Sequence, residues 1–175
     1  MAWNKDHKEN SKKRILDSAA KLFAHNGFKT ISIDEVMQHA GLTRGAFYSH
    51  FKSKSDLYAE AILYGSQKSR QQLSNVFEVD KIVNAYLSEA HVEGEERHCP
   101  LAFLVSDINQ QNQTIRDTYT TTFNSLVDKM QLSGLNREQA LKQCVLMVGG
   151  VAISRALNDK SLVTELLASC KELDG

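Results

Sequence analysis

Apolar residues recur every three or four positions along most of this chain, with no sustained alternation of apolar and polar residues. The first spacing is typical of amphipathic helices, whereas alternation is typical of half-buried strands. The chain contains a single proline, Pro100, so little interrupts the helical segments. The pattern therefore predicts an all-α protein.

Capping residues and glycines indicate where the predicted helices begin and end. Asn26-Gly27 is a typical helix stop, and the S-x-x-E box from Ser32 to Glu35 is a typical helix start. Ser53 and Asp56 repeat that spacing. The expected helices lie at about 11–25, 32–41, 43–51, 53–76, 79–88, 100–112, 114–132, 137–157 and 161–173, with a polar loop at 93–100.

The predicted helix at 43–51 is short and follows a tight glycine turn, as in a helix-turn-helix. In that motif the second helix enters the major groove of DNA and presents its N-terminal side chains to the bases. Leu42, Phe47 and Phe51 are expected to face inward. Gly45 should cost about 1 kcal/mol relative to Ala within a helix, a cost often tolerated where a neighbour approaches closely. We expect that neighbour to be DNA.

The polar residues around this helix suit contacts with DNA. Arg44 can bind O6 and N7 of guanine with its two-pronged guanidinium group. Thr43 is placed to cap the helix and to donate to a phosphate. Tyr48 and His50 offer further donors, and Lys54 lies at a helix start, where N–H groups favour an anion. Taken singly, Tyr48 and His50 are better explained as ordinary surface residues, but that explanation does not account for the ordered set.

The charge distribution is uneven, although the formal net charge is zero. Residues 1–54 hold ten Lys and Arg against five Asp and Glu, which leaves eleven basic and sixteen acidic residues in 55–175. The two parts therefore carry about +5 and −5. A basic N-terminal part favours a polyanionic partner, but a solvated charged face would give the same imbalance.

The run AAKLFAHNGFKTISIDEVMQHAGLTRGAFYSHFKSKSDL at 19–57 resembles the DNA-binding domain of the TetR family of transcriptional regulators. It has an aromatic residue after the first-helix glycine, a capped second helix, A-G-x-[ST]-x-G, Y-x-H-F, and x-S-K before an acidic residue. The resemblance implies a helix-turn-helix DNA-binding domain at 1–54 and a helical effector-binding and dimerisation domain at 55–175. It further implies a homodimer that binds a palindromic operator on double-stranded DNA.

The resemblance also assigns roles to individual residues. It implies base contacts by Arg44 and Gly45, and phosphate contacts by Ser32, Thr43, Tyr48, His50 and Lys54. Ile31 departs from the family pattern, where Thr is frequent, and Ala46 occupies a variable position that helps to set sequence preference. The N-terminal MAWNKDHKENSKKR resembles the basic arm of some members, in which Trp3 would be an anchor or disordered.

The helix predicted at 137–157 has apolar residues on nearly all faces, so it should be buried on two sides. One side would be the chain's own core and the other a partner subunit, with Gly149-Gly150 allowing close approach. The helix predicted at 161–173 adds a second apolar stripe, which would give a four-helix dimer seam. Alternatively, both helices complete the core of a monomer. The runs HCPLAFLVSDI and VGGVAISRALNDKSLVTELLASC resemble a TetR subgroup whose sixth helix begins near a Cys-Pro.

A pocket for a small-molecule effector is expected among the fourth to eighth helices, lined by apolar and aromatic side chains. Aromatic residues at helical spacing are often plain core, so each candidate has that alternative. Cys99 precedes Pro100 and is expected to cap a helix, where the positive helix end would favour a reactive thiolate. It could instead be a small capping residue at the pocket edge. The candidates are Tyr64, Phe77, Tyr86, Cys99, Phe103, Tyr119 and Phe123.

Other classes of protein find little support. The chain has three cysteines, no recognisable signal peptide and no apolar stretch of transmembrane length, which favours the cytoplasm. No metal-ligand spacing, nucleophile-base arrangement or phosphate loop is present, so we expect neither an enzyme nor a cofactor. The expected function is a repressor released from its operator by a small molecule. The alternative is a DNA-independent helical module that docks proteins, which would not require the set Arg44, Tyr48, His50 and Lys54.

Overall fold

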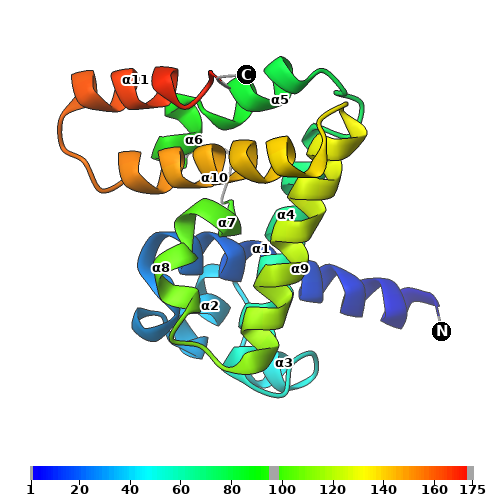
Figure 1. Ribbon diagram of the computed structural model, residues 1–175. Helices are drawn as coiled ribbons and strands as arrows, with labels where there is room; N and C mark the ends of the chain where they lie inside the picture. Colours follow the sequence, from blue (N-terminus) through cyan, green and yellow to red (C-terminus); the bar gives the residue numbers. More distant parts are fainter. Residues whose placement is uncertain (1, 95–98, 173–175) are drawn as a thin grey trace.

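A computed structural model of the protein describes residues 2–94 and 99–172, without the side chains of residues 2–5 and 72. Throughout these ranges all regular structure is helical, which confirms the predicted fold class. Helices α4 and α9 connect the two ends of the molecule, with α2 and α3 at one end and α10 and α11 at the other (Figure 1). The helices are α1 (Ala2–Thr30), α2 (Ile33–His39), α3 (Arg44–Tyr48), α4 (Lys54–Gln72), α5 (Val79–Tyr86), α6 (Glu89–Glu93), α7 (Pro100–Phe103), α8 (Val105–Ile108), α9 (Gln113–Leu132), α10 (Arg137–Ser154) and α11 (Lys160–Ser169).

Helix α1 begins at Ala2, so the prediction of a start near Ser11 was wrong. The added turns are polar and project from the body of the molecule (Figure 1). They lack glycine and proline, and Lys and Glu are good helix formers, but no apolar stripe marks them as helical. The predicted stop at Gly27 is confirmed, because its φ of 74° and ψ of 172° interrupt the helix there.

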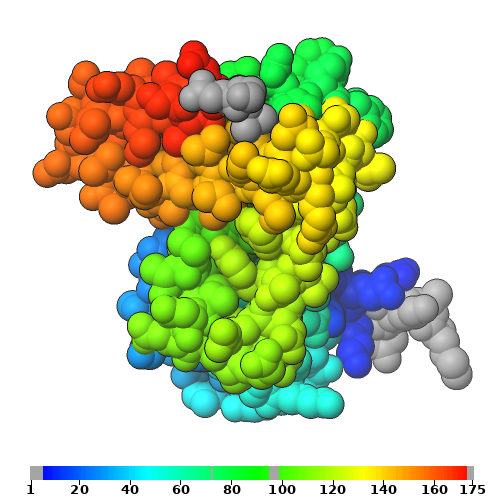
Figure 2. All heavy atoms as spheres, in the orientation of Figure 1, coloured from blue at the N-terminus to red at the C-terminus, as the bar shows by residue number. Residues whose placement is uncertain are grey.

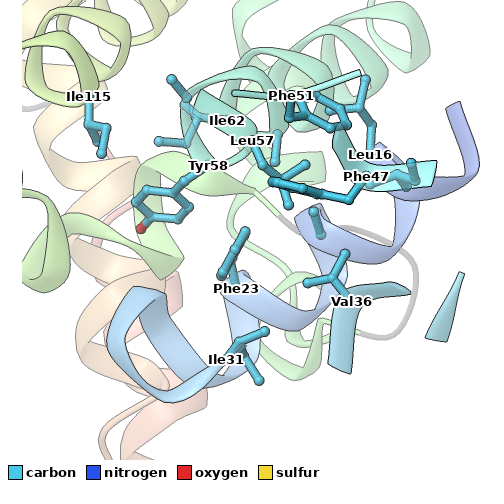
Figure 3. Packing of buried hydrophobic residues seen from close by; sticks show 14 of the residues in the cluster. Leu16, Phe23, Ile31, Val36, Phe47, Phe51, Leu57, Tyr58, Ile62 and Ile115 are labelled. Atoms are coloured by element: carbon cyan, nitrogen blue, oxygen red, sulfur yellow. The ribbon is translucent and has the colours of Figure 1, made fainter. Parts of the chain in front are cut away.

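The first hydrophobic core joins α1 to α4 with residues that follow much later in the chain. Phe23 of α1, Val36 of α2, Phe47 of α3 and Tyr58 of α4 are almost fully buried together, as Figure 3 shows. Ile115 at the start of α9 completes one side of this cluster. Helix α2 packs against α1 and α3, and α1 packs against α4, so tertiary packing holds the two short helices α2 and α3.

The second core lies between α5, α9, α10 and α11. Met147 and Val151 of α10 are fully buried in it, as are Val127 of α9 and Ile82 of α5. The Val151 side chain therefore belongs to the core of its own subunit. Among the described residues, no helix is long and apolar enough to cross a membrane.

The segment expected as one helix at 100–112 forms two short helices, α7 and α8, that meet at Leu104. Leu104 has φ of −111° and ψ of 1°, which breaks the helix. The break lets Leu101 pack into the second core while Leu104 and Ile108 pack into the first. A straight helix could not serve both cores, which is why periodicity alone mispredicted this segment.

The segment before α7 also differs from the prediction. Helix α6 was not expected, and it begins at Ser88, whose side chain accepts a hydrogen bond from the backbone N–H of His91. It covers Glu93, the first residue of the segment predicted as a loop. Residues 95–98, the middle of that predicted loop, lie outside the described residues.

Candidate nucleic-acid interface

A capping box fixes the start of α2, as the sequence predicted. The Ser32 hydroxyl accepts from the Glu35 N–H at 3.2 Å, and the Glu35 carboxylate accepts from the Ser32 N–H at 2.7 Å. The hydrogen bonds from Ser32 lower the pKa of Glu35. At the other end, Arg14 of α1 donates to the Ala40 carbonyl at 2.7 Å, and Gly41 turns the chain with φ of 64°. Both ends of α2 are thus fixed, and the turn sets the direction of α3.

Helix α3 packs through one face and exposes the other. Phe47 and Phe51 are 0% and 2% exposed, and they lie beside Leu57 and Leu16 in Figure 3. Tyr48, the next residue after Phe47, is 60% exposed. The predicted division into a packed face and an outer face is therefore confirmed for these aromatic residues.

Thr43 and Arg44 are both exposed at the N-terminus of α3. Thr43 is the N-cap residue by its backbone, but its side chain makes no capping hydrogen bond, so the predicted capping role of the hydroxyl was wrong. The Arg44 guanidinium donates to Asp34 of α2 at 2.8 Å. A hydrogen bond with Tyr48 and the charge of Asp34 raise the pKa of Arg44. Sequence spacing gave no signal for Asp34, because the pair joins two different helices.

Gly45 is exposed on the same face, and the protein itself leaves the space beside it open. A Cβ atom built at Gly45 would meet only the Thr43 hydroxyl, at 3.9 Å, which is an ordinary contact. Gly150 of α10 is a useful contrast, because a Cβ there would come within 3.0 Å of Leu87. No contact inside the chain therefore requires glycine at position 45.

His50 and Lys54 are less exposed than expected, because each contacts a residue of α1. The His50 ring nitrogen Nε2 lies 2.8 Å from the Ser11 hydroxyl, and burial, followed by Lys8, lowers the pKa of His50. The Lys54 ammonium lies 4.3 Å from the centre of the Phe28 ring. His50 is therefore only partly exposed. Its contact with phosphate stays a prediction.

An aspartate of α8 joins this region to the second half of the chain. Asp107 accepts from the Tyr58 hydroxyl at 2.7 Å and from the Phe28 N–H at 3.3 Å. Burial and this hydrogen bond raise the pKa of Tyr58, so the hydroxyl stays a donor at neutral pH. Since Phe28 also contacts Lys54, Asp107 lies one residue away from a proposed DNA contact. Nothing in the sequence singled out Asp107.

Comparison with known proteins gives a family for this region. The family described as "Bacterial regulatory proteins, tetR family" matches residues 15–61. The HTH-type transcriptional regulator AcrR of Shigella flexneri is 45% identical over 56 residues, which are 32% of this chain and 26% of AcrR. YerO of Bacillus subtilis (strain 168), an uncharacterised HTH-type transcriptional regulator, is 39% identical over 67 residues, 38% of this chain and 23% of YerO. The matches thus span about a quarter of these curated relatives.

Solved structures extend the likeness in fold to nearly the whole chain. A TetR-family regulator from Agrobacterium tumefaciens superposes with a TM-score of 0.73 at 22% identity, over 94% of this chain and 97% of that one. A TetR regulator from Chloroflexus aurantiacus J-10-FL superposes with a TM-score of 0.77 at 18% identity, over 95% of this chain and 94% of that one. The family match in sequence covers residues 15–61, and these two TetR-family structures share the fold of nearly the whole chain. At these identities the structural likeness establishes the fold alone.

The second half of the chain contains a cavity of about 340 Å³. Of the seven predicted effector contacts, Phe77, Tyr86 and Cys99 line this cavity. The apolar wall also includes Ile82, Leu101, Leu126 and Leu132, which the sequence did not single out. The complete lining is Ser66, Ser69, Arg70, Leu73, Ser74, Phe77, Ile82, Tyr86, Cys99, Pro100, Leu101, Thr122, Ser125, Leu126, Lys129 and Leu132.

The other four predicted effector residues are not part of that lining. Burial and a hydrogen bond with Asp17 of α1 raise the pKa of Tyr64 to about 12. The Tyr119 hydroxyl donates to the Leu101 carbonyl at 2.7 Å. Phe103 packs beneath the Arg155 guanidinium, 3.5 Å from its ring centre. Phe123 packs against the second core. These aromatic residues have structural contacts, and an effector role for them stays a prediction.

Cys99 caps α7 by its backbone, as the sequence predicted, and Pro100 is the first helical residue. Its side chain is 5% exposed and makes no capping hydrogen bond. The Sγ atom lies 3.2 Å from the Tyr86 hydroxyl. Burial limits access of bulky reagents to the thiol, and the sensor role of Cys99 stays a prediction.

Proposed function

We propose that this chain is a homodimeric, cytoplasmic transcriptional repressor of the TetR family that binds a palindromic operator and leaves it when a small molecule binds. The proposal covers DNA binding by Ser32, Thr43, Arg44, Gly45, Tyr48, His50 and Lys54, and a domain boundary near residues 54 and 55. Helix α7 of this chain begins at Cys99-Pro100. This start supports placing the chain in the TetR subgroup that has a Cys-Pro at the start of the corresponding helix. No catalytic role is proposed.

The outer face of α3 is the observation that supports DNA binding most directly. Arg44 and Tyr48 are exposed there on either side of Gly45, while Phe47 anchors the helix from behind. The glycine has open space beside it, so a nearby backbone from another molecule can approach. A guanidinium and a phenol around a small gap suit the major groove, where base edges and phosphates lie close together.

An apolar stripe on α10 supports the homodimer. Leu141, Val145, Gly149 and Ile153 follow one another at four-residue spacing, which places them on one face of the helix. Val145 and Ile153 are 62% and 54% exposed, and a Cβ at Gly149 would meet nothing within 4 Å. Gly150 instead packs against Leu87, so the two glycines serve different faces. Figure 2 shows α10 and α11 on the molecular surface at the end away from α3.

Exposed apolar stripes of this kind mark protein–protein contacts. Leu162 of α11, 44% exposed, extends the stripe, so two helices of each subunit would form the seam. With the α10–α11 ends paired, the two copies of α3 would each be available to read one half-site. Half-site centres are then expected about 34–36 Å apart, or a multiple of that spacing.

The proposal can be tested by selecting duplex DNA from a random pool and measuring affinity by fluorescence anisotropy. Arg44→Ala should cost about 1–3 kcal/mol of binding free energy and relax preference at one base position. Lys54→Ala should weaken binding to all sequences and reduce the salt slope by about one. Arg137→Ala, a matched exposed change at the start of α10, should have no effect.

Unchanged affinity in both Arg44→Ala and Lys54→Ala would contradict the assignment of α3 as the recognition helix. Failure of the wild type to select any duplex would favour the alternative, a helical module that docks proteins. Such a module would also lack the steep loss of affinity with rising salt that phosphate contacts cause.

A further inference from the structure

The cavity bounded by α4, α5, α7 and α9 combines an apolar interior with basic side chains at its rim. We propose that it binds an amphipathic monoanion, a molecule with a flexible apolar body and one acidic head group. Arg70 and Lys129 hold the head group, and the interior takes the apolar body. The inference names the chemical class of the effector and therefore rests on the proposed function.

The hydroxyl groups of the wall offer a ligand no free donor. Five serine and threonine residues line the cavity, and each donates its hydroxyl proton to a backbone carbonyl three or four residues earlier in the chain. Hydroxyls bonded in this way leave mainly their carbon atoms and one acceptor to the cavity. The bonds are Ser66 to Leu63, Ser69 to Gly65, Ser74 to Gln71, Thr122 to Thr118 and Ser125 to Thr121, with oxygen–oxygen distances of 2.8, 3.1, 2.9, 2.9 and 3.0 Å.

At the buried end of the cavity, the polar side-chain atoms also have partners within the protein. Tyr86 is 6% exposed, and its hydroxyl lies 3.2 Å from the Cys99 sulfur. Burial raises the pKa of Tyr86, so the phenol stays neutral. Ile82 and Leu101, 0% and 4% exposed, form the rest of this end. The interior therefore suits hydrocarbon, because a polar ligand group there would lose its hydration without a partner.

The rim has the opposite character. Arg70 is exposed, and the Lys129 ammonium lies 4.3 Å from the centre of the Phe77 ring. No Asp or Glu lines the cavity, and among the described residues neither Arg70 nor Lys129 forms an ion pair. Two basic groups beside an apolar cavity attract an anion and disfavour a cation. Phe77 and Leu132 are 56% and 75% exposed at this mouth, so an apolar ligand would cover them.

The size of the cavity limits the ligand. A volume of about 340 Å³ lies at the lower end of the range for small-molecule sites, roughly 300–1,000 Å³. At about 30 Å³ per water-sized group, it holds on the order of ten to fifteen non-hydrogen atoms. Decanoate fits this limit and carries one carboxylate, so it is a suitable probe.

Binding to the full chain can be measured by isothermal titration calorimetry and thermal unfolding, without DNA. Decanoate should bind and raise the unfolding temperature, 1-decanol should bind about tenfold more weakly, and decyltrimethylammonium should not bind. Arg70→Gln and Lys129→Gln should each weaken decanoate binding by about tenfold and leave decanol binding unchanged. Arg116→Gln, an exposed change near the other end of α9, is the matched control and should bind decanoate normally.

Two results would overturn the inference: no binding of decanoate, or equal binding of decanoate and decanol with both charge variants unaffected. Leu126→Trp should abolish binding of both decanoate and decanol by filling the cavity, and normal binding in that variant would place the ligand elsewhere. Operator affinity is measured separately by anisotropy. If the wild type binds decanoate but no operator DNA, the proposed function is refuted and the ligand class stands. If the wild type binds operator DNA but not decanoate, only the ligand class is refuted.

Discussion

Gly45 allows a test in which protein stability and DNA affinity should change in opposite directions. In the free protein, the added methyl group of Gly45→Ala would contact only the Thr43 hydroxyl at 3.9 Å, so it causes no clash. Alanine is favoured over glycine within a helix by about 0.5–1 kcal/mol. The free energy of unfolding should therefore rise by about that amount.

On DNA the same methyl group would occupy the gap between Arg44 and Tyr48. Overfilling a close contact typically costs about 1–3 kcal/mol, which corresponds to roughly 5- to 150-fold in affinity. Urea unfolding followed by circular dichroism measures the first effect, and fluorescence anisotropy on the selected duplex measures the second. Ser49→Ala, at the exposed C-cap of the same helix, is the control and should leave DNA affinity unchanged.

The reasoning fails if Gly45→Ala binds the duplex as tightly as wild type. That result would mean that no DNA atom approaches α3 at Gly45, so the open space beside the glycine has no role in recognition. A fall in the free energy of unfolding would contradict the other half of the prediction, because it would show that glycine is needed for the fold.

Four further substitutions test the region that joins α3 to the rest of the molecule and the proposed seam. Asp107→Ala leaves the buried Tyr58 hydroxyl without its acceptor, so the free energy of unfolding should fall by about 1–3 kcal/mol in urea titrations. The pKa of His50 is lowered in the folded state. His50 therefore contributes to the free energy of unfolding above pH 6.5, and this contribution is lost as the pH falls below 6.5. His50→Gln should lose less stability than wild type between about pH 7 and pH 5, and equal losses would contradict the role of burial. Val145→Glu should give a folded monomer in analytical ultracentrifugation, whereas Val151→Glu should unfold the chain. A monomeric wild type at micromolar concentration would refute the seam.

The sequence by itself determined the helical class, the capping box at Ser32, the glycine stop at Gly27 and the buried face of α3. These features depend on residues close together in the chain, such as the hydrogen bonds between Ser32 and Glu35 or the adjacent Phe47 and Tyr48. Local backbone geometry and the helical repeat decide them before any distant contact forms. The family resemblance rested on the same local residues, because α2, α3 and the turn between them are specified by a short continuous run.

Contacts between distant segments were decided only by the tertiary structure. Arg44 meets Asp34 across a turn, His50 meets Ser11 of α1, and Asp107 meets Tyr58 and Phe28 across more than 45 residues. No periodicity encodes such pairs, since each depends on how two helices pack. The helical extension of α1 was missed for the related reason that an exposed polar helix has no apolar stripe.

The break at Leu104 and the cavity show the same limit. Leu104 interrupts a segment with helical periodicity because its neighbours must enter two different cores, which local propensity does not record. Aromatic residues marked the second half as apolar, but the sequence could not separate Tyr86, which lines the cavity, from Tyr119, which bonds to Leu101. Whether an apolar side chain faces a core, a partner or a cavity depends on the packing of neighbouring helices, and only the folded structure fixes that packing.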